Sequence, residues 1–249
     1  MVIFLIALSA LVMEAVDTGI GMMYGTLLTP FLVLCGCDPK VVVPSILLSQ
    51  ALGGFMASWQ HHRTKNASLA IHSRDFKIAA TIVLLGVFAT FMGAFTGAFV
   101  SKTIITIYIG ILVFAMGILV IWNPSWKFSW AKIVGLGTLS SFNKALSGGG
   151  FGPIIVSGQI LTDRPGKNAI GTTDFAEAPV CLMGFLTWLW FNHSFPEYHV
   201  LVPLCIGAMI GGIIGPNILS KVGSNKTIIK VVGWTAVALG VLTLVKVFT

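Results

Sequence analysis

Acidic residues inside apolar stretches are the first candidates for chemistry in this sequence. Glu14 and Asp17 are three residues apart, as are Asp174 and Glu177, so each pair shares one face of a helix. An acidic side chain within a membrane segment is costly and is a functional candidate by default. Because two carboxyl groups on one face favour keeping one of them protonated near neutral pH, we expect one of the four to carry a coupling proton. The alternative is a structural acid bonded to a neighbouring helix or to Lys144.

Glycine gathers at two places, in the stretches G-I-G-M-M-Y-G and S-G-G-G-F-G-P. Glycine interrupts helices, and a helix that begins after such a break presents unpaired N–H groups and the positive end of its dipole. We therefore expect two broken helices whose N–H groups converge on a small anion. For the first stretch, close packing of two helices is the alternative. The candidate anion-binding positions are Gly21, Gly25, Ser147, Gly148, Gly149 and Gly150.

Polar side chains near these glycines complete the expected anion site. Lys144 lies one helical turn before the second cluster, directly after Asn143. We expect Lys144 to supply positive charge and Asn143 a hydrogen-bond donor. The hydroxyl groups of Thr172 and Thr173 and the amide of Gln50 are the remaining candidates for substrate binding. The alternative for Lys144 is a side chain that extends to the membrane interface.

Other residue types favour no enzyme, metal or cofactor. The five histidines fall outside the expected membrane segments, so we interpret His61, His62 and His72 as side chains of a solvated loop. The four cysteines form no CxxC pair and are interpreted as small buried side chains. The sequence contains no Ser-His-Asp arrangement, Walker loop or dinucleotide-binding glycine motif. We expect neither catalysis nor a cofactor.

The elements that position these residues must lie in a lipid bilayer. Of the 249 residues 56% are hydrophobic and 9% are charged, and the mean hydropathy is +0.94. A soluble domain has about 25% charged residues. We predict an all-α polytopic membrane protein. The net charge of +7 is typical of cytoplasmic loops and does not indicate nucleic-acid binding, because no basic run is interleaved with aromatic residues.

Polar interruptions divide the chain into about ten apolar segments, of which we expect about eight to ten in the membrane. Two of them, 22–35 and 151–161, are too short to cross about 30 Å of hydrocarbon, and both follow a glycine cluster. We expect these two to be half-helices. The first run lacks the basic residues of a signal peptide, and we expect it to be mature structure. The segments are 1–18, 22–35, 41–60, 76–100, 103–122, 131–146, 151–161, 168–192, 199–220 and 227–247.

The two halves of the chain repeat each other at an offset of 127 residues. This offset places Gly21 on Gly148 and Lys40 on Lys167, and segment lengths follow the same order in each half: long, short, long, long, long. We assign residues 1–122 to a first membrane repeat, 123–130 to a linker and 131–249 to a second repeat.

Charge predicts how the two repeats are oriented. Residues 61–77 contain Arg63, Lys65, Arg74 and Lys77, whereas the corresponding loop at 192–198 contains no Lys or Arg. By the positive-inside rule the loop at 61–77 is cytoplasmic and the second repeat is inverted relative to the first. The first two segments of each half then enter and return on one side, and both termini lie outside. The expected location is the cytoplasmic membrane.

The two glycine stretches resemble the motifs of the sulfite exporter TauE/SafE family of membrane permeases. The first reads D-T-G-I-G-M-M-Y-G-T-L-L-T-P from Asp17, and the second reads S-G-G-G-F-G-P from Ser147. Each is followed by a lysine and small residues, at Lys40 and at Lys167. The resemblance spans essentially the whole chain. It implies transport of a small sulfur-containing anion, such as sulfite, thiosulfate or a sulfonate, coupled to protons.

The prediction is a secondary transporter that binds a small anion where the half-helices meet and exposes it to each side in turn as the repeats rock. One alternative is a channel or facilitator for another small solute, with a flux insensitive to pH. The other is a non-transporting accessory membrane subunit whose glycines serve helix packing. The expected partners are a small anionic substrate and the lipid bilayer, and a homo-oligomer is left open.

Overall fold

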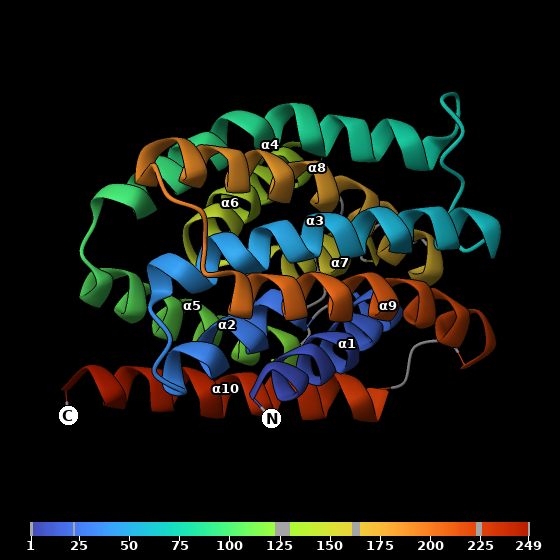
Figure 1. Ribbon diagram of the computed structural model, residues 1–249. Coiled ribbons are helices and arrows are strands. Elements are labelled where there is room, and N and C mark those ends of the chain that lie inside the picture. Colours follow the sequence, from blue (N-terminus) through green and yellow to red (C-terminus); the bar gives the residue numbers. More distant parts are fainter. Residues whose placement is uncertain (1, 22, 123–129, 161–164, 223–225, 249) are drawn as a thin grey trace.

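The computed structural model describes residues 2–21, 23–122, 130–160, 165–222 and 226–248, and within them the chain forms ten α-helices (Figure 1). This confirms the predicted all-α fold. The proposed linker at 123–130 lies, apart from its last residue, outside the described residues. The helices are α1 (Val2–Ile20), α2 (Tyr24–Leu34), α3 (Pro39–Arg63), α4 (Arg74–Phe99), α5 (Lys102–Trp122), α6 (Trp130–Ser147), α7 (Phe151–Ile160), α8 (Gly166–Asn192), α9 (Tyr198–Val222) and α10 (Lys226–Phe248).

Local sequence explains where these helices begin and end. The carboxylate of Asp38 accepts a 2.9 Å bond from the N–H of Lys40 at the start of α3, and Pro39 lies in the first turn. The hydroxyl of Ser73 caps α4 in the same way. The chain leaves the helical conformation at Gly21 and Gly148, whose φ angles are +83° and +77°. The short helices α2 and α7 follow these two glycines, as predicted.

Hydrogen bonds define one end of the helix bundle, which we call the loop end because it carries residues 64–73 between α3 and α4. The side chain of Asn66 donates to the backbone oxygen of Pro216 near the end of α9, at 2.9 Å. The side chain of Asn168, near the start of α8, donates to Asp75 at 3.0 Å. The loop end therefore holds the end of α3, the start of α4, the start of α8 and the end of α9.

The opposite end of the bundle is held by two lysines. Lys102 at the start of α5 forms a 2.5 Å ion pair with Asp38 before α3. Lys246 near the end of α10 donates to the backbone oxygen of Val33 at the end of α2, at 2.8 Å. The C-terminus and the connection between α8 and α9 lie at this end, away from the connection between α3 and α4 (Figure 1).

Helix packing is related between the two halves by exchange of equivalent helices. α1 packs mainly against α9, and α6 packs mainly against α4. α3 packs against α9 as α8 packs against α4, while the pairs α3 with α8 and α5 with α10 join corresponding helices. The long helices α3 and α8 therefore meet in the interior, where the ends of α1 and α6 also reach them.

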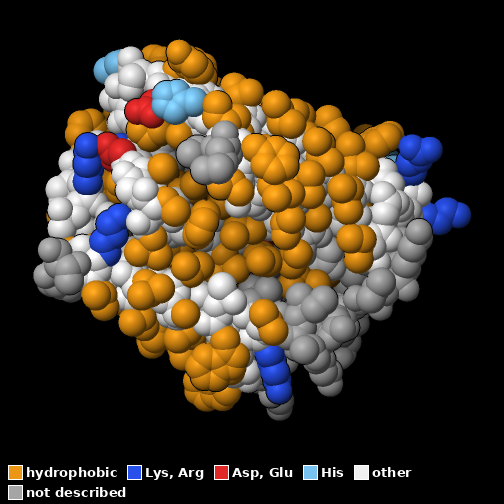
Figure 2. All heavy atoms as spheres, turned by 60° about the horizontal axis from the view of Figure 1, so that its bottom comes forward, with side chains coloured by type: hydrophobic (Ala, Val, Ile, Leu, Met, Phe, Trp, Pro, Cys, Tyr) orange, Lys and Arg blue, Asp and Glu red, His pale blue; other side chains and the backbone are white. Residues whose placement is uncertain are grey.

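The outer surface is suited to lipid. On α4, for example, Leu84 is 76% exposed and Phe88 is 72% exposed. Figure 2 shows hydrophobic side chains covering the middle of one face, with charged side chains mostly near its two edges. Five described helical stretches are long and apolar enough to cross a membrane. They are Ile3–Ile20, Pro39–Arg63, Arg74–Phe99, Lys102–Trp122 and Tyr198–Ile218.

Candidate functional site

A chain of polar side chains joins four helices in the centre of the molecule. Gln50 of α3 donates to Asp17 of α1 at 2.9 Å and accepts a bond from the ammonium group of Lys144 of α6. Lys144 also forms a 2.7 Å ion pair with Glu177 of α8. All four are at most 5% exposed, so the alternative in which Lys144 extends to the interface is wrong. Such a buried, hydrogen-bonded row is costly to build, which makes it the main candidate site.

The polar chain draws equally on both halves. Asp17 and Lys144 are 127 residues apart, and so are Gln50 and Glu177. Each half thus contributes one residue just before its glycine break and one residue from the long helix that follows. Asp17 also accepts a hydrogen bond from the N–H of Tyr24, at the positive end of α2. The polar chain therefore lies at the interface between the halves.

The two glycine breaks touch beside Lys144. A Cβ atom on Gly25 would overlap the backbone oxygen of Gly148 and lie 2.8 Å from the Lys144 ammonium. A Cβ atom on Gly149 would lie 3.0 Å from the backbone oxygen of Gly25. Because only glycine permits so close an approach, the first break serves close packing, and it does so directly against the second.

The N–H groups of the second break differ in how firmly they are bonded. The N–H of Gly148 donates to the backbone oxygen of Lys144 at 2.8 Å, which continues α6. The N–H of Gly149 reaches the Ser147 hydroxyl, and that of Gly150 reaches the Thr26 hydroxyl, both at 3.3 Å. These two longer bonds are the easier ones for an anion to replace.

Thr29 is a site residue that sequence reasoning missed. Its side chain is fully buried, and its hydroxyl has no hydrogen-bond partner among the described residues. A Cβ atom on Gly148 would lie 2.6 Å from this hydroxyl. The available signal was a polar residue on the short apolar helix α2. Thr29 thus offers an unused donor beside the glycine break.

Glu14 is buried without any polar partner. Its side chain is 1% exposed, and neither carboxyl oxygen has a hydrogen-bond partner among the described residues. The nearest backbone is at Gly53, where a Cβ atom would lie 2.5 Å from the Glu14 carboxyl. A carboxyl group in such surroundings is more stable protonated than charged.

The interpretation of His61 as a solvated loop residue is wrong. It lies in the last turn of α3 and is fully buried, because α8 and α1 cover that turn. Its Nε2 atom lies 2.9 Å from the carboxylate of Asp174 and 3.1 Å from the backbone oxygen of Thr18. Asp174 and Glu177 therefore share a helix but have different partners, because Glu177 bonds Lys144.

Other predicted residues lie around this centre rather than in it. Asn143 accepts a hydrogen bond from the hydroxyl of Tyr108 on α5, a partner the sequence did not suggest. Thr173 accepts a 2.8 Å bond from Gln159 of α7. Thr172 is fully buried on the same helix. Gly21 packs against the side chains of Val156 and Ile170.

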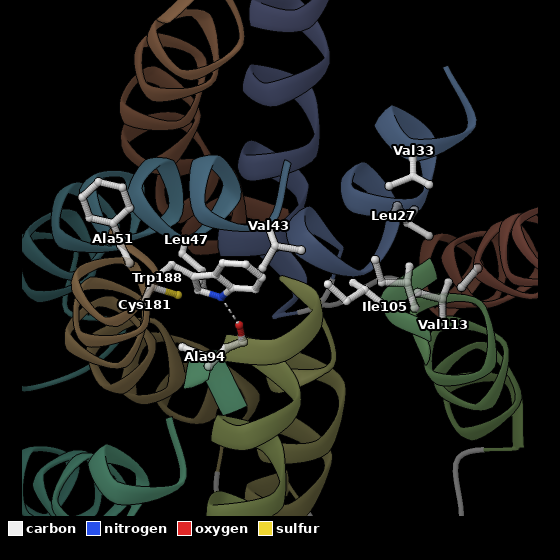
Figure 3. Close-up of a cluster of buried hydrophobic side chains, with 14 of the residues drawn as sticks. Leu27, Val33, Val43, Leu47, Ala51, Ala94, Ile105, Val113, Cys181 and Trp188 are labelled. Atoms are coloured by element: carbon white, nitrogen blue, oxygen red, sulfur yellow. Dashed lines mark hydrogen bonds between the residues drawn. The ribbon is translucent and has the colours of Figure 1, made fainter. Parts of the chain in front are cut away.

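A tryptophan covers the polar chain on the side away from the loop end. Trp188 of α8 is fully buried and lies with Leu47, Ala51 and Cys181 in one hydrophobic cluster (Figure 3). Its indole N–H donates to the backbone oxygen of Ala145 at 2.7 Å. A small pocket of about 30 Å³ at the opposite end is lined in part by the Trp188 ring.

Comparison with known proteins places these features in a family context. The family model described as "Sulfite exporter TauE/SafE" matches residues 5–243. The "Probable membrane transporter protein YtnM" of Bacillus subtilis (strain 168) is 24% identical over 245 residues, which covers 84% of this chain and 78% of that protein. No solved structure matches the chain. The family match includes both glycine breaks and all four residues of the polar chain.

Proposed function

The chain belongs to the sulfite exporter TauE/SafE family and is a membrane transporter rather than an enzyme, and on this premise we propose that it carries a small sulfur-containing anion together with protons. Sulfite, thiosulfate and sulfonates are the proposed substrate class. One observation carries the proposal: the row Asp17, Gln50, Lys144 and Glu177 lies beside two touching glycine breaks, where the halves meet.

In the proposed binding step the anion takes the place that Glu177 and Gln50 now occupy around Lys144. Lys144 is the only buried Lys or Arg side chain in the part of the chain that the structure describes. The Thr29 hydroxyl and the N–H groups of the second break lie next to it. An ammonium group with several neutral donors suits the oxygen atoms of a small oxyanion.

Charge balance favours coupling of the anion to protons. Lys144 is surrounded by four buried carboxyl groups, those of Glu14, Asp17, Asp174 and Glu177. An anion entering among ionised carboxylates is repelled, so it binds well only when one or more of them are protonated. Glu14, which has no partner to stabilise its charge, is the most favourable of the four.

We propose alternating access by rocking of two inverted repeats, residues 1–122 and 131–249. The exchange of helix pairs between the halves supports this arrangement. The loop end carries Arg63, Lys65, Arg74 and Lys77, which favours placing it in the cytoplasm and both termini outside. In this arrangement the protein resides in the cytoplasmic membrane.

Counterflow in liposomes tests the proposed function. Purified protein is reconstituted with unlabelled thiosulfate inside, and uptake of radiolabelled thiosulfate is followed. We expect uptake by the parent protein and its loss in Lys144→Met. Lys77→Met, which removes an exposed lysine at the start of α4, is the matched control and keeps parental uptake. No uptake by the parent of thiosulfate, sulfite or a sulfonate contradicts the proposal.

A facilitator for a cationic solute is the second candidate. The observation that favours it is the excess of buried carboxyl groups over Lys144, since carboxylates attract cations. Such a facilitator moves its solute down a gradient at a rate independent of pH, and anions do not compete. Competition by thiosulfate therefore separates the two candidates.

A further inference from the structure

Two aromatic side chains at equivalent positions close the molecule on either side of the polar chain. His61 and Trp188 are 127 residues apart, and each ring N–H faces a backbone oxygen, of Thr18 and of Ala145, that are also 127 apart. We call His61 with Asp174 the polar closure. The corresponding pair on the other side, Trp188 with Leu47, is the apolar closure; both side chains belong to one cluster (Figure 3).

The order of residues along α3 and α8 places the polar chain between the two closures. Along α3, Leu47 comes first, then Gln50, and His61 lies at the loop end. Along α8, which runs the other way, Asp174 lies nearest the loop end, followed by Glu177 and then Trp188. A solute at Lys144 therefore meets the polar closure toward the loop end and the apolar closure toward the opposite end.

Hydrogen-bond geometry fixes the tautomer of His61. The amide nitrogen of Asn66 lies 2.9 Å from the backbone oxygen of Pro216, which only accepts, so this side-chain atom is the NH₂ group. The same nitrogen lies 3.1 Å from His61 Nδ1, which must therefore be unprotonated. The ring proton is on Nε2, where it points to Asp174 and Thr18. His61 is thus neutral and is held between Asn66 and Asp174.

From this geometry we propose that His61 passes the coupling proton between the loop end and Asp174, and that this transfer releases Asn66. The proposal rests on the proposed proton-coupled transport. A proton from water binds Nδ1, the Nε2 proton moves to the Asp174 carboxylate, and the ring is left neutral in its other tautomer. In that tautomer Nδ1–H faces the NH₂ group of Asn66. Two donors repel, so Asn66 leaves Nδ1.

Release of Asn66 opens the loop end because Asn66 links two elements. Its NH₂ group bonds both His61 on α3 and Pro216 on α9, and a neighbouring bond of 2.8 Å joins Gln60 to Asn217. Loss of the first bond loosens residues 64–73 from the bundle. The proton that neutralises Asp174 is then the same one that opens the path for the anion.

The charged and titratable groups around His61 are consistent with a proton relay. α8 presents Asp174, with Glu177 one turn further on. α1 presents the Thr18 oxygen, and the same helix carries Glu14 and Asp17. Lys144 of α6 is already paired with Glu177, and α9 contributes only neutral groups to these contacts, through Pro216 and Asn217. Asp174 is thus the carboxylate in direct contact with the ring.

The apolar closure cannot exchange protons. Trp188 and Leu47 carry no titratable group, and the indole N–H only donates. The equivalent positions therefore differ in one property, and it makes the two ends unequal: protons reach the carboxyl groups through the loop end, while the opposite end opens by displacement of Trp188. Residue choice at one pair of positions assigns the direction of proton entry.

Acid-stimulated uptake in proteoliposomes tests this inference. Uptake of radiolabelled thiosulfate is measured between about pH 5 and 8, where an unperturbed histidine titrates. For the parent we expect a rise of up to about tenfold per pH unit, the limit for one coupled proton. In His61→Gln, whose amide keeps a donor toward Asp174 but takes up no proton, we expect uptake to become independent of pH. His62→Gln, which changes the exposed neighbouring histidine, keeps the parental profile.

A second variant tests the lock without changing the histidine. Asn66→Ala removes the link to Pro216 and is expected to allow thiosulfate uptake with less than about twofold change over the same pH range. Parental pH profiles in both His61→Gln and Asn66→Ala overturn the inference while leaving the proposed function intact. A parent that moves no anion, or moves it without protons, contradicts the proposed function itself.

Discussion

Asp17 and Lys144 occupy equivalent positions just before the two glycine breaks, and the side chain of Gln50 bonds to both of them. A carboxylate and an ammonium group thus stand at positions related by the repeat. The difference in charge means that the two halves cannot play the same part in the site. In our account Lys144 attracts the anion, whereas the carboxyl groups set the condition that protons accompany it.

The ion pair between Lys144 and Glu177 predicts a strong dependence of stability on both partners. Lys144→Met leaves a buried carboxylate without its partner, and removal of one member of a buried pair costs about 3–5 kcal/mol. The double variant Lys144→Met with Glu177→Gln removes both charges and is expected to recover most of that loss. Unfolding of the three proteins in detergent measures the coupling; additive losses contradict the pairing.

The contact between the glycine breaks predicts that Gly25→Ala is severe. Its methyl group would overlap the backbone oxygen of Gly148, and overpacking of this kind costs about 1–3 kcal/mol or more. Gly135→Ala is the matched control, because nothing lies within 4 Å of the added atom. It should leave the melting temperature unchanged or raise it slightly. Equal melting temperatures for both variants would show that the breaks do not touch.

The unpartnered carboxyl group of Glu14 predicts a role in proton coupling that is separable from folding. Glu14→Gln keeps the size of the side chain and removes its ability to bind a proton. We expect the folded protein to remain, with thiosulfate uptake that responds less to an imposed pH gradient than in the parent. Fluorescence of a pH indicator inside the vesicles follows the protons. A parental proton signal in this variant assigns the coupling to the other carboxyl groups.

The orientation of the ends predicts which cysteines react from outside the cell. Cys35 is exposed at the end opposite the loop end, whereas Ile71 is 70% exposed in the loop itself. A membrane-impermeant maleimide should label Cys35 in intact cells of a Cys37→Ser variant. A cysteine placed by Ile71→Cys should react only after the membrane is permeabilised. The reverse pattern contradicts the proposed sidedness.

Helix positions could be predicted from the sequence because local residues set them. Gly21 and Gly148 end helices through their own backbone conformation, and a capping residue before α3 and another before α4 start the next ones. The expected segment 151–161 and the helix Phe151–Ile160 agree for this reason. Hydropathy added the membrane setting without any knowledge of contacts.

The partners of buried polar groups could not be predicted, because they depend on contacts between distant segments. His61 lies beside Arg63 at a helix end, and nothing near it in sequence indicates that Asp174 covers it. Lys144 posed the same difficulty, since its depth depends on Gln50 and Glu177 from two other helices. Sequence spacing identified the acidic and basic residues of the site, but not which of them pair.

Simultaneous measurement of anion and proton movement tests the central claim most directly. Liposomes containing the protein and an internal pH indicator receive an inward gradient of radiolabelled thiosulfate at equal pH on both sides. Our account predicts that protons enter together with the anion and that Lys144→Met abolishes both signals while Lys77→Met keeps both. Anion entry without proton entry, or parental anion entry in Lys144→Met, would contradict it.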